Sequence, residues 1–356
     1  MRWDVTAWPS TRVMTVTPEA LANAVRRLRA GGLVAFPTET VYGLGTDATD
    51  GKAIARLYDA KGRPTFNPLI AHVHDAAQAR SLGIFDGVAA RLAEAFWPGP
   101  LTLAVPRQPG CPVADLATAG LATIALRVPA HNVARDLLAA FGGPIVAPSA
   151  NRSGHVSPTT AQHVLADLRG RIDLVLDGGP SLVGLESTIV ACIGEPTLLR
   201  PGGLPRADIE RVLGHPLADG PPPIELTDSE EGPLAPGQLA SHYAPRTPLR
   251  LNARTVDTDE ALLAFGEPIP PGNDHAVSIL NLSPGADMLE AAANLFSYLR
   301  ALDALGASAI AVMPIPQSGL GEAINDRLQR AAAPRPDETP QQPRYKLHDP
   351  KDEHDV

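Results

Sequence analysis

The chain has 356 residues, which is enough for about two domains of ordinary size. Hydrophobic residues make up 44% and charged residues 19%, a balance typical of globular proteins. The net charge of -9 and the 4% of aromatic residues argue against a protein that binds nucleic acid through its overall field or by base stacking. Neither an apolar leader nor a run of about eighteen apolar residues occurs, so a cytoplasmic protein without a membrane partner is expected.

The N-terminal part of the chain alternates predicted helices with predicted strands. Thr17 and Pro18 mark the start of a helix that the pair Gly31-Gly32 ends. Strands are expected at residues 33–36, 69–73, 101–105, 123–128, 144–147, 172–176, 187–193 and 197–199, and helices at 54–58, 87–96, 131–141, 160–168 and 207–213. This pattern predicts a large mixed-sheet α/β domain over residues 10–214, with some neighbouring strands antiparallel.

The C-terminal part is expected to form a second, smaller domain. Residues 215–246 are rich in Pro, Gly and acidic residues and are predicted to be an exposed interdomain linker or lid. Apolar runs at 249–251, 276–282 and 307–312 then alternate with helical patterns at 287–305 and 320–333. This predicts a small Rossmann-like α/β domain with a parallel sheet over residues 247–333. The polar, proline-rich residues 334–356 are expected to be disordered.

Short segments rich in Gly, Pro and hydroxyl groups follow several of the expected strands. They are PTETVYGLG at 37–45, KGRP at 61–64 with NPL at 67–69, LRVP at 126–129, APSAN at 147–151, ESTIV at 186–190 and LRPG at 199–202. The first is expected to be a loop, because its proline would stop strand pairing and its glycines permit tight turns. Each segment is weak evidence alone, but together they predict a nucleotide site.

The basic residues near the second segment are candidates for binding phosphate. Lys61 and Arg63 follow a predicted helix and precede a proline, so both are expected to project from a loop toward polyphosphate, with Arg127 completing the cradle. The alternative for such a K-x-R pair is a solvated basic turn. The chain contains neither a P-loop nor a dinucleotide-binding fingerprint, so a different fold must hold the nucleotide.

Three other features of the sequence bear on possible chemical roles. Ser187 superficially resembles a nucleophile, but its segment is not G-x-S-x-G and leads into a β-branched strand. His72 and His74 would face the same side of a strand, which suggests either a metal site with no evident third ligand or, preferably, one histidine facing a substrate. Cys111 and Cys192 match no metal spacing and are expected to be buried free thiols.

The ordered motifs resemble those of the threonylcarbamoyl-AMP synthases, the YrdC-like family, in its long form with an extra C-terminal domain. The resemblance covers roughly residues 13–214, and Pro236-Gly237 with HYAP at 242–245 resembles the segment between the two domains. Many relatives carry a basic residue shortly after this Pro-Gly, whereas residues 238–241 here are QLAS. A phosphate contact from that stretch is therefore not expected.

The resemblance implies a reaction in which L-threonine, bicarbonate and ATP give threonylcarbamoyl-AMP and pyrophosphate. The product would pass to the tRNA threonylcarbamoyl-transfer machinery, which modifies an adenosine beside the anticodon. Because the carbamate of threonine attacks the α-phosphorus, the protein needs to supply positioning and charge neutralisation rather than a covalent nucleophile. Mg²⁺ is expected on the phosphates of ATP, with no metal ligand from protein side chains.

The resemblance also implies a role for individual residues. L-Threonine would be held by Thr40, His72, Arg127, Ala147 and Ser187. ATP would be held by Lys61, Arg63, Asn67, Thr123, Ser149, Asn151, Ser157, Arg200 and Tyr243, with Lys61 and Arg63 as the catalytic cations.

Two other functions are compatible with such a fold. One is a double-stranded RNA or tRNA-binding module without adenylation activity, against which the acidic charge and the few aromatic residues argue. Strong direct binding of nucleic acid is therefore not expected. The other is a carbamoyltransferase that uses carbamoyl-adenylate chemistry, but such proteins usually carry Cys-rich or kinase-like domains that this chain lacks.

Overall fold

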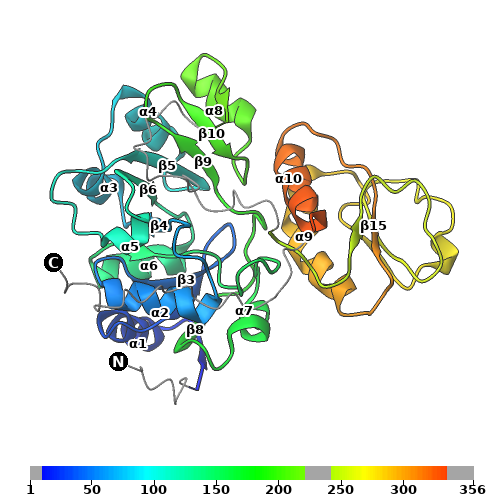
Figure 1. Ribbon diagram of the computed structural model, residues 1–356, viewed down its shortest axis with the longest axis horizontal. Coiled ribbons are helices and arrows are strands. Elements are labelled where there is room, and N and C mark those ends of the chain that lie inside the picture. The colour runs from blue at the N-terminus through cyan, green and yellow to red at the C-terminus, as the bar shows by residue number, and fades with distance from the viewer. Residues whose placement is uncertain (1–9, 221–241, 335–356) are drawn as a thin grey trace, which may run out of the picture.

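The computed structural model describes residues 10–220 and 242–334 of the chain. These residues form two lobes, the larger drawn from blue to green and the smaller from yellow to red (Figure 1). Helices α9 (Met288–Asp303) and α10 (Leu320–Ala332) of the smaller lobe lie on the side that faces the larger lobe. The linker and the tail predicted from the sequence fall mostly at residues 221–241 and 335–356, outside the described residues.

The larger lobe is built on one mixed sheet of eleven strands, in the order β1-β8-β2-β3-β7-β4-β6-β5-β9-β10-β11. Its strands are β1 (Arg12–Thr15), β2 (Val34–Pro37), β3 (Tyr42–Asp47), β4 (Ile70–His72), β5 (Leu101–Pro106), β6 (Thr123–Arg127), β7 (Ile145–Val146), β8 (Leu174–Asp177), β9 (Thr188–Ala191), β10 (Thr197–Arg200) and β11 (Ala218–Asp219). The sheet contains parallel pairs, such as β4 with β6, and antiparallel pairs, such as β5 with β6. The predicted mixed α/β class is therefore confirmed.

The helices of the larger lobe cover this sheet (Figure 1). They are α1 (Pro18–Arg29), α2 (Gly51–Lys61), α3 (Ala76–Leu82), α4 (Gly87–Phe96), α5 (Asp115–Thr118), α6 (Asn132–Phe141), α7 (Ala161–Leu168) and α8 (Arg206–Leu213). Helix α1 starts at Thr17, whose hydroxyl accepts from the backbone N–H of Ala20, as the sequence predicted. Helix α2 starts at Asp50, whose carboxylate caps the N–H groups of Lys52 and Ala53.

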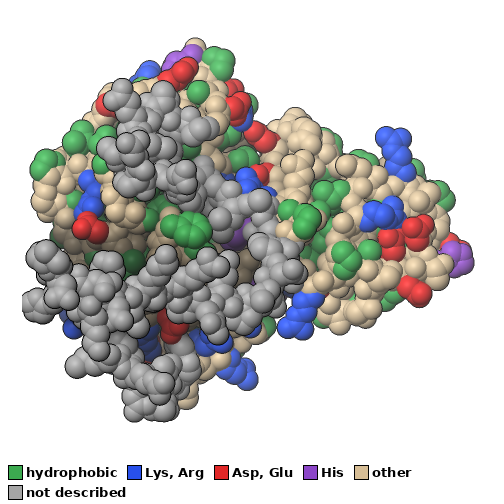
Figure 2. All heavy atoms as spheres, in the orientation of Figure 1, with side chains coloured by type: hydrophobic (Ala, Val, Ile, Leu, Met, Phe, Trp, Pro, Cys, Tyr) green, Lys and Arg blue, Asp and Glu red, His purple; other side chains and the backbone are tan. Residues whose placement is uncertain are grey.

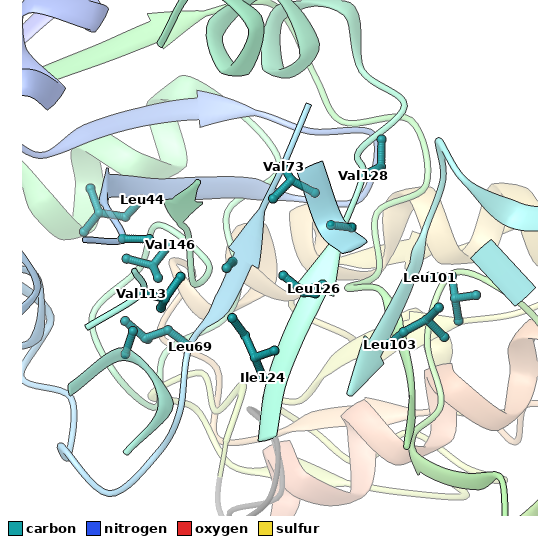
Figure 3. Close-up of a cluster of buried hydrophobic side chains, with 14 of the residues drawn as sticks. Leu44, Leu69, Val73, Leu101, Leu103, Val113, Ile124, Leu126, Val128 and Val146 are labelled. Atoms are coloured by element: carbon teal, nitrogen blue, oxygen red, sulfur yellow. The ribbon is translucent and has the colours of Figure 1, made fainter. Parts of the chain in front are cut away.

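Apolar side chains from the central strands pack into one large cluster (Figure 3). Leu44, Leu103 and Leu126 in this cluster are fully buried, and Ile54 and Leu57 of α2 pack against it. Burying side chains of this size contributes on the order of 1.5 to 3 kcal/mol each. This core fixes the ends of β4, β6 and β9, where the polar residues of the motifs lie.

The segment PTETVYGLG is a β-hairpin rather than the predicted loop. Strands β2 and β3 pair antiparallel, and Pro37 lies opposite Tyr42 in the register. The glycines allow close packing: a Cβ atom on Gly45 would lie 2.6 Å from Cε1 of Phe36 and 2.9 Å from Cγ2 of Ile145. The sequence prediction was wrong here because these glycines serve side-chain packing inside a strand rather than a turn.

The end of the larger lobe also differs from the prediction. Strand β11 follows α8 and pairs parallel with β10, so the large sheet extends beyond the expected boundary at residue 214. The pairing joins Thr197 to Ala218 and Leu198 to Asp219. Ala218 and Asp219, which fall within the linker expected from residue 215, therefore belong to the sheet.

The smaller lobe is a four-stranded sheet in the order β12-β15-β13-β14, with every pair parallel. Its strands are β12 (Leu249–Arg250), β13 (Ala261–Ala264), β14 (Ile279–Asn281) and β15 (Ile310–Val312), with a short 3-10 helix η1 (Asn273–His275) before β14. The predicted parallel α/β unit is confirmed, although β13 was missed because its four apolar residues show no alternation. No helix in the described ranges is both long and apolar enough to cross a bilayer.

The two lobes share a hydrophobic cluster and several polar contacts. Val41, Val156 and Leu185 of the larger lobe pack with the buried residues of α9 and α10. The loop before β9 approaches α9 so closely that a Cβ atom on Gly184 would lie 2.3 Å from the carbonyl oxygen of Ala292. Arg300 of α9 donates to the carboxylate of Asp167 at 2.9 Å.

Candidate active site

A cavity lies at the ends of the central strands, where several motifs meet. The described residues that line it are Thr38, Thr40, Val41, Gly43, Arg63, Ile70, His72, Arg127, Ala147, Pro148, Ser149, Glu186, Ser187, Arg200, His242 and Tyr243. They come from the β2–β3 hairpin, from the segments after α2 and β7, from β4, from the ends of β6 and β10, from the entry to β9 and from the segment before β12. The motifs that are scattered along the sequence thus form one site.

All five residues predicted for L-threonine line this cavity. His72 and Arg127 are direct partners in the register of the parallel strands β4 and β6, so their side chains lie next to each other. The hydroxyl oxygens of Thr38 and Thr40 lie 2.8 Å apart, and Thr38 also donates to the carbonyl of Val41 at 2.6 Å. The turn that presents Thr40 is therefore held by its own side chains.

Arg127 forms a buried ion pair with Glu39 that the sequence analysis missed. Its Nη2 lies 2.6 Å from Oε1 of Glu39, and its Nε donates to the carbonyl of Gly99. The second carboxylate oxygen of Glu39 accepts from the backbone N–H of Ala130 at 3.1 Å. This pair fixes the guanidinium in one orientation at the cavity wall.

Burial and the neighbouring Arg127 lower the pKa of His72 to about 3, so its imidazole is neutral at physiological pH. Its Nδ1 lies 3.3 Å from the carbonyl oxygen of Ile70. His74 lies beyond the end of β4 and lines a different, open depression beside Asp75 and Gln78. The two histidines therefore do not share a ligand, and the preferred interpretation, one histidine at the site, fits this geometry.

Ser187 connects two strands at the entry to β9. Its hydroxyl lies 2.7 Å from that of Thr102, and Arg200 donates to the same hydroxyl at 3.2 Å. Arg200 also donates through Nη2 to the carbonyl of Ser187 at 2.7 Å. The side chains that bond to this hydroxyl among the described residues are those of Thr102 and Arg200, and neither is a general base, so Ser187 is placed to bind rather than to attack.

Lys61 differs most from the prediction. It is the last residue of α2 and is only 3% exposed, so it does not project from a loop into solvent. Its ammonium group donates to the backbone carbonyls of Ser149 and Asn151. Burial, and then the charge of Arg63, hold its pKa well below the usual value. The packing of α2 carries Lys61 inward and leaves it bound to the APSAN loop.

Arg63 follows the left-handed C-cap Gly62 and does face the cavity. Its guanidinium donates to the carbonyls of Asn67 at 3.3 Å and Pro68 at 3.0 Å. Among the described residues no carboxylate lies within ion-pair distance of it. Burial lowers its pKa to about 10, which leaves it charged at neutral pH. A buried guanidinium that binds neutral carbonyls and has no carboxylate partner among the described residues favours an anionic ligand.

The other residues predicted for ATP divide into two groups. Ser149, Arg200 and Tyr243 line the cavity together with Arg63. The residues that do not line it are Lys61, Asn67, Thr123, Asn151 and Ser157. Thr123 starts β6 whereas Arg127 ends it, so the structure separates Thr123 from the cavity wall. Its assignment stays a prediction.

Asn67 is 1% exposed, and both polar atoms of its amide lack a hydrogen-bond partner among the described residues. An unpartnered buried amide is unfavourable unless a ligand or water satisfies it. Asn67 is held beside Arg63, whose Nε donates to its carbonyl. The unpartnered amide therefore favours a polar ligand or water beside Arg63, although Asn67 itself does not line the cavity.

Glu186 and His242 also line the cavity, although the sequence motifs that contain them predicted no individual role for either residue. Glu186 accepts from the hydroxyl of Ser157, which was predicted to contact ATP. Burial is the main reason that the pKa of His242 is lowered to about 3. The carboxylate of Glu186 raises this pKa, whereas the charges of Arg63, Lys61 and Arg327 lower it. Tyr243 is 1% exposed and stacks on Phe296 of α9 at 5.7 Å between ring centroids.

The cysteines take no part in the site. Cys192 is buried, and burial raises its thiol pKa to about 12, as expected for an inert thiol. Cys111 is a free thiol that is only partly buried, so the prediction of burial was wrong for it. It lies in the loop that connects β5 to α5.

The mixed sheet, the arginine-lined cavity and the small parallel lobe define a two-domain α/β protein with a YrdC-like site for an anionic ligand. Family models agree over both lobes: one described as "Telomere recombination" matches residues 26–202, and one described as "Threonylcarbamoyl-AMP synthase, C-terminal domain" matches residues 204–333. The chain belongs to the threonylcarbamoyl-AMP synthase family, which confirms the resemblance seen in the sequence.

Individual relatives cover nearly the whole chain. The threonylcarbamoyl-AMP synthase of Bacillus subtilis (strain 168) is 39% identical over 347 residues, 94% of this chain and 98% of that protein. The enzyme of the same name from Pyrococcus abyssi is 40% identical over 325 residues, 86% and 92% of the two chains. The crystal structure of P. abyssi Sua5 complexed with L-threonine superposes with a TM-score of 0.80 at 35% identity, covering 90% of this chain and 97% of that one.

Proposed function

We propose that the protein is an L-threonylcarbamoyladenylate synthase that converts L-threonine, bicarbonate and ATP to threonylcarbamoyl-AMP and pyrophosphate. The observation that carries this proposal is the meeting of two sets of residues in one cavity. The five positions assigned to L-threonine line it, and so do the buried guanidinium groups of Arg63 and Arg200. Such a site holds a small zwitterion beside a polyanion.

The chemistry requires no nucleophile from the protein. The threonine amine attacks the carbon of CO₂ formed from bicarbonate and loses a proton, which gives a carbamate. A carbamate oxygen then attacks the α-phosphorus, and the bond from that phosphorus to the bridging oxygen breaks to release pyrophosphate. The residues hold the two reactants in line and neutralise the charge that develops on the phosphates.

Each charged group has a defined part in this proposal. Arg127, fixed by Glu39, binds the threonine carboxylate, and the neutral His72 contributes hydrogen bonding without an added charge. Arg63 faces the phosphates as the catalytic cation. Lys61 acts through the loop whose carbonyls it binds, holding Ser149 and Asn151 against the nucleotide.

Mg²⁺ would be held at this site through the phosphates. In the part of the chain that the structure describes, the carboxylates of Glu39 and Glu186 beside the cavity already pair with Arg127 and Arg327. Phosphate oxygens and water would therefore supply the ligands, which is how Mg²⁺ commonly binds with nucleotides. When bound with ATP, Mg²⁺ neutralises part of the triphosphate charge.

We further propose that the product is handed to the tRNA threonylcarbamoyl-transfer machinery in the cytoplasm and that the protein itself binds no nucleic acid strongly. The visible face of the smaller lobe carries acidic and basic side chains interspersed rather than a basic patch (Figure 2). This distribution, together with the net charge of -9, does not favour a duplex-binding surface on that face.

Pyrophosphate release with each substrate omitted in turn tests the function. Release should need ATP, L-threonine and bicarbonate together, and mass spectrometry should find threonylcarbamoyl-AMP as the second product. Equal release without any amino acid would refute the proposal.

A filter-binding assay with tRNA over a salt series tests the alternative, because an RNA-binding module would bind tightly at low salt and lose affinity steeply as salt rises.

A further inference from the structure

A buried arginine of the smaller lobe reaches the wall of the cavity. Arg327 of α10 is 0% exposed, and its Nε lies 2.8 Å from Oε2 of Glu186. Its Nη2 donates at 3.0 Å to the carbonyl of Pro201, the residue after Arg200. Its guanidinium carbon also lies 5.0 Å from the centroid of the Tyr243 ring. One side chain thus contacts three segments of the site.

Glu186 is an acidic residue in a cavity suited to anions. It is 6% exposed and lines the same cavity as Arg63 and Arg200. One carboxylate oxygen accepts from the hydroxyl of Ser157 and the other from Arg327. Burial alone would raise the pKa of Glu186, but the charges of Arg327 and Arg200 and these two hydrogen bonds bring it below the usual value. The side chain is therefore a carboxylate at neutral pH.

An uncompensated carboxylate at this place would repel the phosphates of ATP and the carboxylate of threonine. In a buried site such repulsion is weakly screened, so one charge has a large effect. Ser157 can donate a hydrogen bond but brings no charge. Arg327 is the cation that ion-pairs with Glu186 among the described residues, and it comes from the other lobe. It also pairs with Asp326 of its own helix, but Arg330 pairs with the second carboxylate oxygen of Asp326, so that carboxylate has two cationic partners.

We propose that Arg327 is a positioning residue of the active site: by pairing with Glu186 it cancels that charge and keeps the cavity favourable to the phosphates of ATP. The small C-terminal domain therefore contributes a side chain to nucleotide binding, not only a covering surface. The inference rests on the proposed use of ATP, and it concerns the change in ATP affinity between variants.

A purely structural role for Arg327 is the competing explanation, because it also joins the two lobes. Arg206 provides the matched control. It lies on α8 and pairs with Glu322 of α10 at 2.8 Å, so it too joins the lobes, but neither residue lines the cavity. Arg206→Gln removes a contact between lobes and leaves the charge at the site unchanged.

The experiment measures ATP affinity by isothermal titration, with the melting temperature of each variant recorded on the same sample. Arg327→Met should weaken ATP binding at least about tenfold, whereas Arg206→Gln should stay within about threefold of the wild type. Glu186→Gln combined with Arg327→Met should restore affinity to within about threefold, because the uncompensated charge is gone. A structural role would give no such recovery.

Three results overturn the proposal. These are unchanged affinity in Arg327→Met, equal losses in Arg327→Met and Arg206→Gln, and no recovery in the double variant. If Arg327→Met does not fold, Arg327→Lys decides, since retained charge should keep affinity within about threefold and a tenfold loss contradicts the charge argument. If the full-length wild type binds ATP but releases no pyrophosphate with threonine and bicarbonate, the proposed function fails while this test still stands.

Discussion

The ammonium nitrogen of Lys61 lies 2.6 Å from the carbonyl oxygen of Ser149, and the same group donates to the carbonyl of Asn151. A helix end and a loop that are far apart in the sequence are thereby joined inside the protein. The sequence predicted a loop cation that faces polyphosphate, whereas the structure places Lys61 at a buried helix end.

Lys61→Met should lower the free energy of unfolding by about 1 to 3 kcal/mol, because two buried carbonyls lose their donor. ATP binding should weaken as well, since the loop at Ser149 loses its support. Urea unfolding and isothermal titration on one preparation measure both effects. Lys52→Met, an exposed position on the same helix, is the control and should change stability by less than about 0.5 kcal/mol. Unchanged stability in Lys61→Met would show that these hydrogen bonds contribute little.

Gly184→Ala should weaken the contact between the two lobes, because the added Cβ would meet the backbone of α9. Gly184 has a φ of 75° and Gly179 a φ of 84°, so alanine at either position costs about 1 to 2 kcal/mol in backbone strain. Only at Gly184 would the added Cβ meet the backbone of α9, while nothing lies within 4 Å at Gly179. Urea unfolding should show a loss larger by about 1 to 3 kcal/mol for Gly184→Ala than for Gly179→Ala. Equal losses of stability in the two variants would mean that the backbone of α9 shifts to accommodate the added Cβ at little cost.

Thr40→Ala and Ser187→Ala should weaken L-threonine binding about tenfold while changing ATP binding less than about threefold. Both hydroxyls lie in the cavity, and each is held in a hydrogen bond with another threonine hydroxyl, that of Thr38 or Thr102. Removing one oriented hydrogen bond to a polar ligand typically costs on the order of 1 kcal/mol or more. Separate titrations with threonine and with ATP measure the two affinities. A larger loss for ATP than for threonine would reassign these residues to the nucleotide.

Acid should destabilise the protein below about pH 6.5, the usual pKa of histidine. His72 and His242 have pKa values of about 3 in the folded protein, so the unfolded chain takes up protons first as the pH falls. Their contribution to stability is complete above pH 6.5 and is lost as the pH drops toward 3. Between pH 7.5 and 5.5 the free energy of unfolding should fall by about 1 kcal/mol for each histidine. The free energy of unfolding of His72→Gln should fall correspondingly less over this pH range. The same dependence of this free energy on pH in both proteins would refute the lowered pKa of His72.

The sequence predicted those parts of the site that strands place locally. His72 and Arg127 each end an apolar run, and because β4 and β6 are parallel neighbours, their ends meet at one edge. The pairing of Glu186 with Arg327 could not be predicted in this way, because the two residues lie in different lobes and neither carries a local pattern. The placement of Lys61 was missed for a related reason. A lysine at the end of a helix looks solvated unless the carbonyls that it binds are known.

The packing of Val41 against the smaller lobe has a consequence for folding while the chain is being synthesised. It belongs to the hairpin that presents Thr40, yet it packs with residues of α9 that are translated much later. Until α9 docks, Val41, Val156 and Leu185 expose apolar surface to water beside an otherwise complete sheet. Domains generally fold in the order in which they leave the ribosome. The β2–β3 hairpin is thus among the first elements synthesised, but its apolar surface is among the last to be buried. A nascent chain that stalls before α9 exposes an aggregation-prone apolar surface next to its substrate cavity.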